Sequence, residues 1–96
     1  MASWTEEGWE LLEGLALNAA VFTGFNQSAF RLIDDALRVC DIAEKNPGIG
    51  KKIKNIYDED RFWHPFHDGK ILIWKVDSIG LKFTGAFYSL PDVLVV

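Results

Sequence analysis

The chain changes its pattern abruptly at Asn46-Pro47-Gly48. Before this tripeptide, apolar residues recur at three- and four-residue spacing, which is typical of amphipathic helices. After it, short apolar runs alternate with turns that contain glycine and aspartate, which is typical of strands. Proline cannot continue a helix and disfavours helical geometry in the residue before it, so the boundary is firm. A chain of 96 residues is too short for two cores, and we expect one domain over residues 1–96.

The first part predicts two helices joined by a short break. The first helix runs from about residue 6 to about residue 22, with Thr5 as its N-cap, and ends at Gly24. Its expected apolar stripe is Trp9, Leu12, Ala16 and Ala20. The second helix begins near Asn26 or Ser28 and ends at Asn46, and its expected apolar stripe is Phe30, Ile33, Leu37 and Cys40.

The second part predicts three strands: 61–66, 71–76 and 79–88. Asp68-Gly69 is a strong hairpin signal between the first two. Pro65 makes the first strand an edge, bulged or short strand, and Gly85 marks a possible bulge in the third. The segment 2–4 can add one short edge strand. We therefore expect an α+β fold, in which an N-terminal helical hairpin packs on a small antiparallel β-meander.

The charge of the chain is unevenly distributed. The net charge is −4, which argues against a general nucleic-acid binder. Residues 1–46 carry eight acids and three bases, whereas the remainder carries seven bases and six acids. Any anion-binding surface should therefore belong to the second part, where the candidates are Lys51, Lys52, Lys54, Arg61 and Lys82.

Several classes of protein are disfavoured by simple counts. The single cysteine, Cys40, excludes an internal disulfide and is expected to be a small buried apolar residue. No apolar run approaches the roughly 18–20 residues that span a bilayer, and no signal peptide is evident, so a cytoplasmic protein that does not enter the membrane is expected. His64 and His67 should lie on opposite faces of an extended segment, so we expect no metal site and no cofactor.

The order of these elements and several residues resemble the RelE/ParE superfamily of bacterial type II toxin–antitoxin toxins. The matching features are Trp4-Thr5 at the start of the first helix, residues 42–50 at the end of the second, Arg61 at the start of a strand, the apolar strand 71–76 and Tyr88 near the end of the last strand. The resemblance implies a toxin that stabilises plasmids and is neutralised by a cognate antitoxin. It is compatible with a homodimer or with a toxin–antitoxin hetero-oligomer.

The resemblance leaves two mechanisms open. A ParE-like member inhibits DNA gyrase by protein contact and is not an enzyme, whereas a RelE-like member is a metal-independent endoribonuclease that cleaves mRNA on the ribosome. The acidic charge favours the first, as does Ser89-Leu90-Pro91, which stands where many members carry arginines. A degenerate, non-toxic relative that acts as a protein-binding module is the alternative, with Phe25, Trp63 and Phe66 as contact candidates.

The ribonuclease mechanism names specific residues. Arg61 would contact the phosphate, Lys52 would supply charge, and Tyr88 would act as acid or base, with His64 or His67 as substitutes. Lys51, Lys54 and Lys82 would bind RNA or another target. Each residue also has a structural interpretation: the lysines at 51, 52 and 54 as a solvated loop, Arg61 in an ion pair with Asp58, Glu59 or Asp60, and Tyr88 at the rim of the core.

Overall fold

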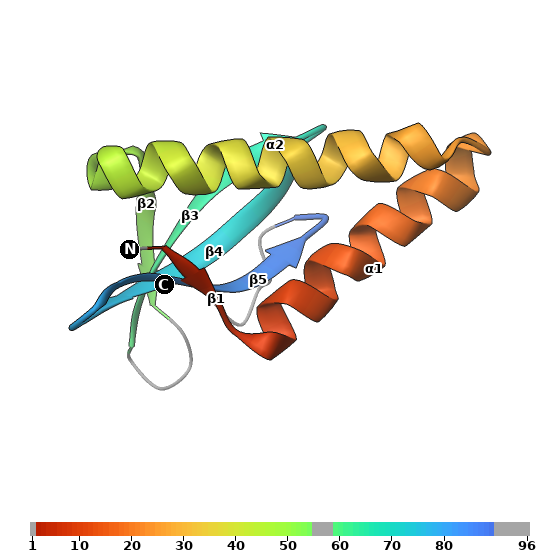
Figure 1. Ribbon diagram of the computed structural model, residues 1–96. Helices are drawn as coiled ribbons and strands as arrows, with labels where there is room; N and C mark the ends of the chain where they lie inside the picture. Colours follow the sequence, from red (N-terminus) through yellow and green to blue (C-terminus); the bar gives the residue numbers. More distant parts are fainter. Residues whose placement is uncertain (1, 55–58, 90–96) are drawn as a thin grey trace.

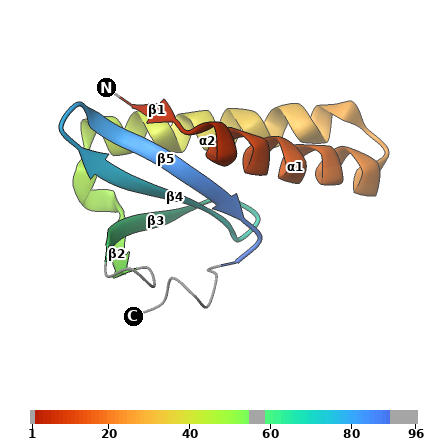
Figure 2. The same cartoon turned by 90° about the horizontal axis from the view of Figure 1, so that it is seen from below.

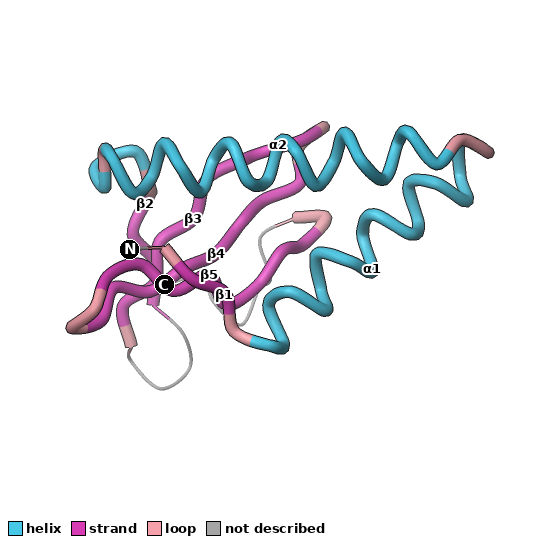
Figure 3. The backbone as a smooth tube through the Cα atoms, in the orientation of Figure 1, coloured by secondary structure: helices cyan, strands magenta, loops and turns pink. Residues whose placement is uncertain are grey.

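The chain folds into a helical layer packed on one face of a sheet (Figure 1, Figure 2). The computed structural model describes residues 2–54 and 59–89. The helical layer is an antiparallel hairpin of α1 (Glu6–Thr23) and α2 (Asn26–Lys45), followed by the short 3₁₀ turn η1 (Pro47–Ile49). The strands are β1 (Ser3–Trp4), β2 (Lys51–Lys54), β3 (Asp60–His67), β4 (Lys70–Asp77) and β5 (Gly80–Phe87). The predicted α+β class is confirmed, with both helices preceding the main strands (Figure 3).

The strand order is β1-β5-β4-β3-β2. The strands β2 to β5 form an antiparallel meander. The expected short edge strand is confirmed as β1, and it pairs in parallel with β5. The solvated-loop interpretation of residues 51–54 is wrong, because these residues form a fourth strand of the meander. The run Lys-Lys-Ile-Lys has little apolar signal of its own, and it becomes a strand through its ladder with β3, in which Lys51 pairs with Trp63.

The ends of α1 form as their local signals predict. The hydroxyl of Thr5 accepts a hydrogen bond from the backbone N–H of Gly8 at 2.9 Å, which satisfies one of the free donors of the first turn. Gly24 adopts a left-handed conformation with φ of 78°, and its N–H bonds the carbonyl of Ala20. A glycine at this position ends α1 without the cost of a Cβ at positive φ.

The expected apolar stripe of α2 is largely wrong. Phe30 and Leu37 are exposed, Ile33 is partly buried and Cys40 alone is buried. The buried line lies about one residue away along the helix and consists of Leu32, Ala36, Val39, Cys40 and Ala43. Two alanines on this line allow the helix backbone to lie close to its neighbours, and this tight layer admits small side chains where the bulkier stripe does not fit.

The core between the layers is centred on Trp74 and Phe83, whose rings lie 5.3 Å apart between centroids. Both are fully buried, with Leu12 and Leu32 from the helices and Leu72 from β4. β4 is buried on both faces, as expected for a central strand. The ladders shift register near Pro65 and near Gly85, so the two bulges that the sequence suggests are present.

The helical hairpin extends past the sheet at its closed end, where α1 meets α2 (Figure 1, Figure 2). Towards this end, the hairpin carries five exposed large apolar side chains: Leu17, Val21, Phe22, Phe25 and Phe30. Within the described residues, neither helix has the length and apolar character needed to cross a membrane.

Candidate functional site

Two of the predicted ribonuclease residues, Arg61 on β3 and Lys52 on β2, form ion pairs with nearby carboxylates. The guanidinium of Arg61 is only 15 % exposed and forms an ion pair with Glu59 at 2.7 Å. The ammonium of Lys52 pairs with Asp60 at 3.3 Å on the neighbouring strand. Asp58, another candidate partner of Arg61, lies outside the described residues. The ion-pair interpretation of Arg61 is therefore confirmed, and the partner is Glu59.

The candidate target-binding lysines lie on strands of the meander. The ammonium of Lys51 lies 5.4 Å from the ring centroid of Trp63, in a cation–π contact. Lys82 on β5 is directly opposite Lys75 on β4. Lys54 ends β2 opposite Asp60. The three candidate lysines, Lys51, Lys54 and Lys82, thus lie on two strands, β2 and β5, rather than in one loop.

Tyr88 does not join Arg61. On β4, Trp74 lies opposite Phe62 of β3, and the next residue, Lys75, lies opposite Lys82 of β5. Because β3 runs antiparallel to β4, Arg61 lies level with Lys75, and therefore also level with Lys82. Tyr88 follows Lys82 by six residues along an extended strand, which corresponds to roughly 20 Å. Arg61 and Lys52 on one side and Tyr88 on the other therefore cannot contact the same phosphate.

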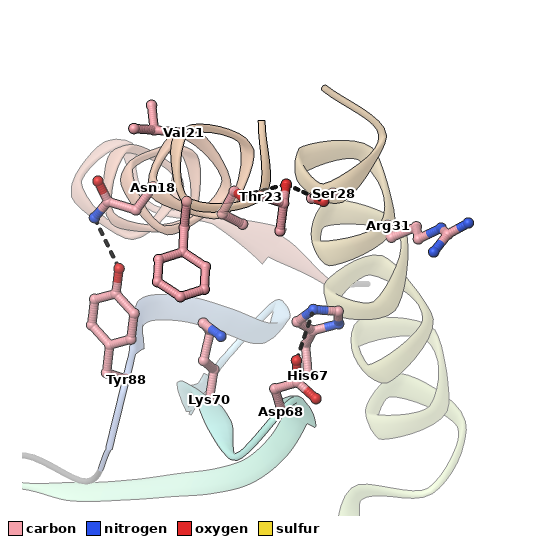
Figure 4. A pocket seen from close by; sticks show the side chains of 11 residues that line it. Asn18, Val21, Thr23, Ser28, Arg31, His67, Asp68, Lys70 and Tyr88 are labelled. Atoms are coloured by element: carbon pink, nitrogen blue, oxygen red, sulfur yellow. Dashed lines mark hydrogen bonds and ion pairs between the residues drawn. The ribbon is translucent and has the colours of Figure 1, made fainter. Parts of the chain in front are cut away.

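Tyr88 instead lines a pocket of about 760 Å³ beneath the overhang of the helical hairpin (Figure 4). We call this the overhang pocket. Its walls come from the last turns of α1, the first turns of α2, the β3–β4 turn and the residue after β5. The side chains that matter for its chemistry are Asn18, Phe22, Arg31, His67, Lys70 and Tyr88.

His67 is held in the pocket by α2. Its Nδ1 lies 2.7 Å from a carboxylate oxygen of Asp35, and its Nε2 lies 3.8 Å from Asp68. A carboxylate can only accept, so Nδ1 carries the hydrogen and donates to Asp35. This arrangement fixes the orientation of the ring, as carboxylates commonly do for functional histidines. His64, the other candidate, has its Nδ1 2.6 Å from the carbonyl of Pro65 and does not line the pocket.

Lys70, which pairs with His67 across the β3–β4 turn, and Tyr88 line the pocket next to His67. The ammonium of Lys70 lies 5.6 Å from the centroid of the Tyr88 ring. The phenol oxygen of Tyr88 accepts a hydrogen bond from the side-chain amide of Asn18 at 2.9 Å, which links the end of β5 to α1 (Figure 4). Arg31 points outward from α2 at the far rim (Figure 4). Within the part of the chain that the structure describes, neither Lys70 nor Arg31 has a carboxylate partner.

The rest of the pocket is apolar and open to solvent. Phe22 lines it and is 93 % exposed, and Val21, beside it on α1, is 79 % exposed. An exposed apolar cluster of this kind is characteristic of surfaces that contact another protein. The pocket thus combines aromatic and aliphatic contact area with the ammonium of Lys70, which has no carboxylate partner among the described residues.

Among the described residues, we find neither a group of metal ligands nor a reactive thiol. No group of three or more histidine, cysteine or carboxylate side chains is placed to hold a metal ion among residues 2–54 and 59–89. Cys40 is buried, and burial raises the pKa of its thiol from the ordinary value of 9.0 to about 12. A thiol with such a pKa is not a nucleophile near neutral pH.

Tyr88 and His67 were candidates from the sequence alone, but the sequence did not predict that both would line the same pocket. The predicted hairpin at Asp68-Gly69 does bring Lys70 next to His67. Asn18 and Phe22 carry no local motif, and they reach the pocket only through the packing of α1 over the β3–β4 turn. No protein-family model matches the chain, and no curated protein matches it.

Proposed function

We propose that this chain is the toxin component of a bacterial type II toxin–antitoxin system, a cytoplasmic protein that arrests growth by contacting a protein target and is neutralised by a cognate antitoxin. The observation that carries the proposal is the overhang pocket, in which Phe22 stands almost fully exposed beside Lys70 and Tyr88. A monomer gains no stability from an aromatic side chain in water, and such residues are common anchors in protein interfaces.

The contact mechanism also accounts for the acidic charge and for the placement of the basic residues. Arg61 and Lys52 are engaged by Glu59 and Asp60, and Tyr88 lies roughly 20 Å from them. A ParE-like toxin acts by protein contact, so it does not require Arg61, Lys52 and Tyr88 to lie together in one catalytic site. DNA gyrase is then the expected target, as the resemblance to the RelE/ParE superfamily implies.

The test is to induce the chain alone in bacteria and to follow incorporation of labelled thymidine, uridine and methionine. Early loss of thymidine incorporation is the expected result. Phe22→Ser should weaken the arrest roughly tenfold or more, because truncating a central aromatic anchor costs about 2 kcal/mol of binding. Val76→Ser is the matched control, since Val76 is also exposed but lies at the far end of β4. Growth without arrest, in cells that contain the folded protein, would favour a non-toxic binding module.

A second function, cleavage of mRNA on the ribosome, is favoured by one specific observation. His67, which is hydrogen-bonded to Asp35, lines the overhang pocket together with Lys70 and Tyr88. A histidine oriented by a carboxylate can take a proton from a ribose hydroxyl, a lysine can stabilise phosphate charge, and a tyrosine can protonate the leaving oxygen.

This second function predicts early loss of methionine incorporation and the appearance of cleaved mRNA. His67→Ala should then abolish the cleavage, whereas the matched variant His64→Ala should retain it, because His64 lies outside the pocket. Arrest that survives both His67→Ala and the double change Arg61→Ala with Tyr88→Phe would exclude the ribonuclease mechanism.

A further inference from the structure

The outward side of α1 carries a continuous line of exposed side chains. Glu6, Glu10, Glu13, Leu17 and Val21 follow one another at intervals of four, three, four and four residues, which places them along one side of the helix. All five are exposed. Leu12, Leu15 and Ala16, which pack on the core, occupy the other side of the helix. No other described element covers this outward side (Figure 1).

The three glutamates of this line lack ion-pair partners within the described chain. Glu6 gains from the helix dipole at the N-terminus of α1, but Glu13 lies beyond the first two turns and gains nothing. Like charges three and four residues apart destabilise a helix slightly. The acidic half of the line therefore adds little to the stability of the monomer, and its carboxylates are available to pair with basic side chains of a partner.

Gly14 lies on the same side, four residues after Glu10 and three before Leu17. A Cβ added there would meet no atom within 4 Å, so the core does not require a glycine. Glycine in an exposed helix interior costs about 1 kcal/mol relative to alanine. Without a side chain, however, it permits a second backbone to approach α1 closely.

We propose that the line from Glu6 to Val21 is a docking face for a basic amphipathic helix of the antitoxin. Lysines or arginines of that helix pair with Glu6, Glu10 and Glu13, its backbone passes over Gly14, and its apolar residues cover Leu17 and Val21. The inference rests on the proposed function for the identity of the partner. It assigns neutralisation to the outward side of α1, which meets the overhang pocket only at Val21, and it leaves the rest of that pocket for the target.

Charge complementarity selects this occupant over the others. A second copy of the chain would bring the same glutamates against this face, and their repulsion opposes a symmetric contact. Nucleic acid and anionic membrane surfaces are repelled for the same reason. A basic segment gains electrostatic attraction at one end of the line and apolar burial at the other.

The probe is a lysine–leucine peptide of about 18 residues with the pattern of an amphipathic helix, titrated into the isotopically labelled full chain and followed by NMR. The matched control peptide has glutamate in place of every lysine. The expected result is a set of shifted amides confined to residues 6–21, with binding that weakens as salt is raised. Binding of the glutamate peptide with equal affinity, or shifts centred on the overhang pocket, would overturn the inference.

Variants of the chain sharpen the result. Glu10→Lys with Glu13→Lys should weaken peptide binding at least tenfold, and Leu17→Ser with Val21→Ser should weaken it without removing its salt dependence. Asp34→Lys is the control, because it reverses an exposed charge on α2 away from the line. Unchanged affinity in the Glu10→Lys and Glu13→Lys variant would exclude the docking face. The docking face would also be excluded if the wild type self-associates and the Glu10→Lys and Glu13→Lys variant does not.

The same variants separate this inference from the proposed function. Expressed without an antitoxin, Glu10→Lys with Glu13→Lys should arrest growth as the wild type does, because these residues lie outside the overhang pocket. If the wild type arrests growth but the lysine peptide does not bind α1, the docking face is wrong and the toxin proposal stands. If the peptide binds α1 but the wild type does not arrest growth, the toxin proposal fails and the face belongs to another basic partner.

Discussion

The Nδ1 atom of His67 lies 2.7 Å from a carboxylate oxygen of Asp35, and this contact joins the β3–β4 turn to the middle of α2. The two side chains are 23 % and 31 % exposed, so water screens the contact only in part. The residues are 32 positions apart in the chain. The contact holds one wall of the overhang pocket in place, and its removal is a direct test of how that wall is supported.

Replacing either partner should reduce the stability of the fold by a modest amount. We expect His67→Ala and Asp35→Ala each to lower the free energy of unfolding by about 1 kcal/mol, because a partly exposed hydrogen bond to a charged group is lost. The double variant should lose less than the sum of the two. Urea unfolding of all four proteins measures the coupling. Fully additive losses would show that the contact contributes nothing to folding.

Two glycines of α1 should respond to alanine in opposite directions. A Cβ on Gly8 would lie 2.6 Å from the carbonyl oxygen of Phe83, so α1 would have to move away from β5. We expect Gly8→Ala to destabilise the protein by about 1–3 kcal/mol. Gly14→Ala meets no atom within 4 Å and should stabilise it by up to about 1 kcal/mol. Thermal unfolding of the two variants checks both signs, and equal shifts would contradict the close contact of Gly8.

Burial of Cys40 should make stability depend on pH in the alkaline range. Its pKa is raised to about 12 in the folded chain from an ordinary value of 9.0, so above pH 9 the unfolded chain loses the thiol proton first. The stabilisation is complete below pH 9 and is lost as the pH rises towards 12. By pH 10 the loss should be roughly 1 kcal/mol.

The comparison that isolates this effect is Cys40→Ala, which removes the titrating group. The difference in unfolding free energy between wild type and variant should shrink from pH 8 to pH 10. A thiol reagent should also modify the native wild type slowly at pH 8 and at full speed in urea. Rapid modification of the native chain would show that Cys40 is accessible.

The ion pairs of Arg61 and Lys52 are expected to be structural. Lys52→Ala should cost less than about 1 kcal/mol, because both partners of its ion pair with Asp60 are exposed. Arg61→Ala should cost more, since the guanidinium is 15 % exposed and its loss leaves Glu59 without this partner. Denaturant unfolding measures the losses. In the growth assay, both variants should still arrest growth, and loss of arrest in a folded Lys52→Ala would contradict the contact mechanism.

Local signals were enough to predict both helices and every strand except β2, in their order along the chain. Thr5 and Gly24 set the ends of α1 through a capping hydroxyl and a left-handed backbone, and both depend only on nearby residues. Asp68-Gly69 sets the β3–β4 turn in the same way, with both residues at positive φ. These features require no knowledge of distant parts of the chain, and so the α+β class followed from the sequence.

Long-range packing decided what the sequence left open. Both stripes of α2 have helical periodicity, and only the fit against the core selected Leu32, Ala36 and Val39 over Phe30 and Leu37. Residues 51–54 form a strand because their backbone pairs with that of β3.

The candidate site likewise depends partly on local sequence signals and partly on the tertiary structure. The amino-acid sequence determined the helical hairpin, the strands that follow it and the acidic charge of the helices, because periodicity, caps and turns act within a few residues. Only the tertiary structure decided that Tyr88 joins His67 and Lys70 rather than Arg61, because the strand register and the overhang of the hairpin bring together residues that share no local signal.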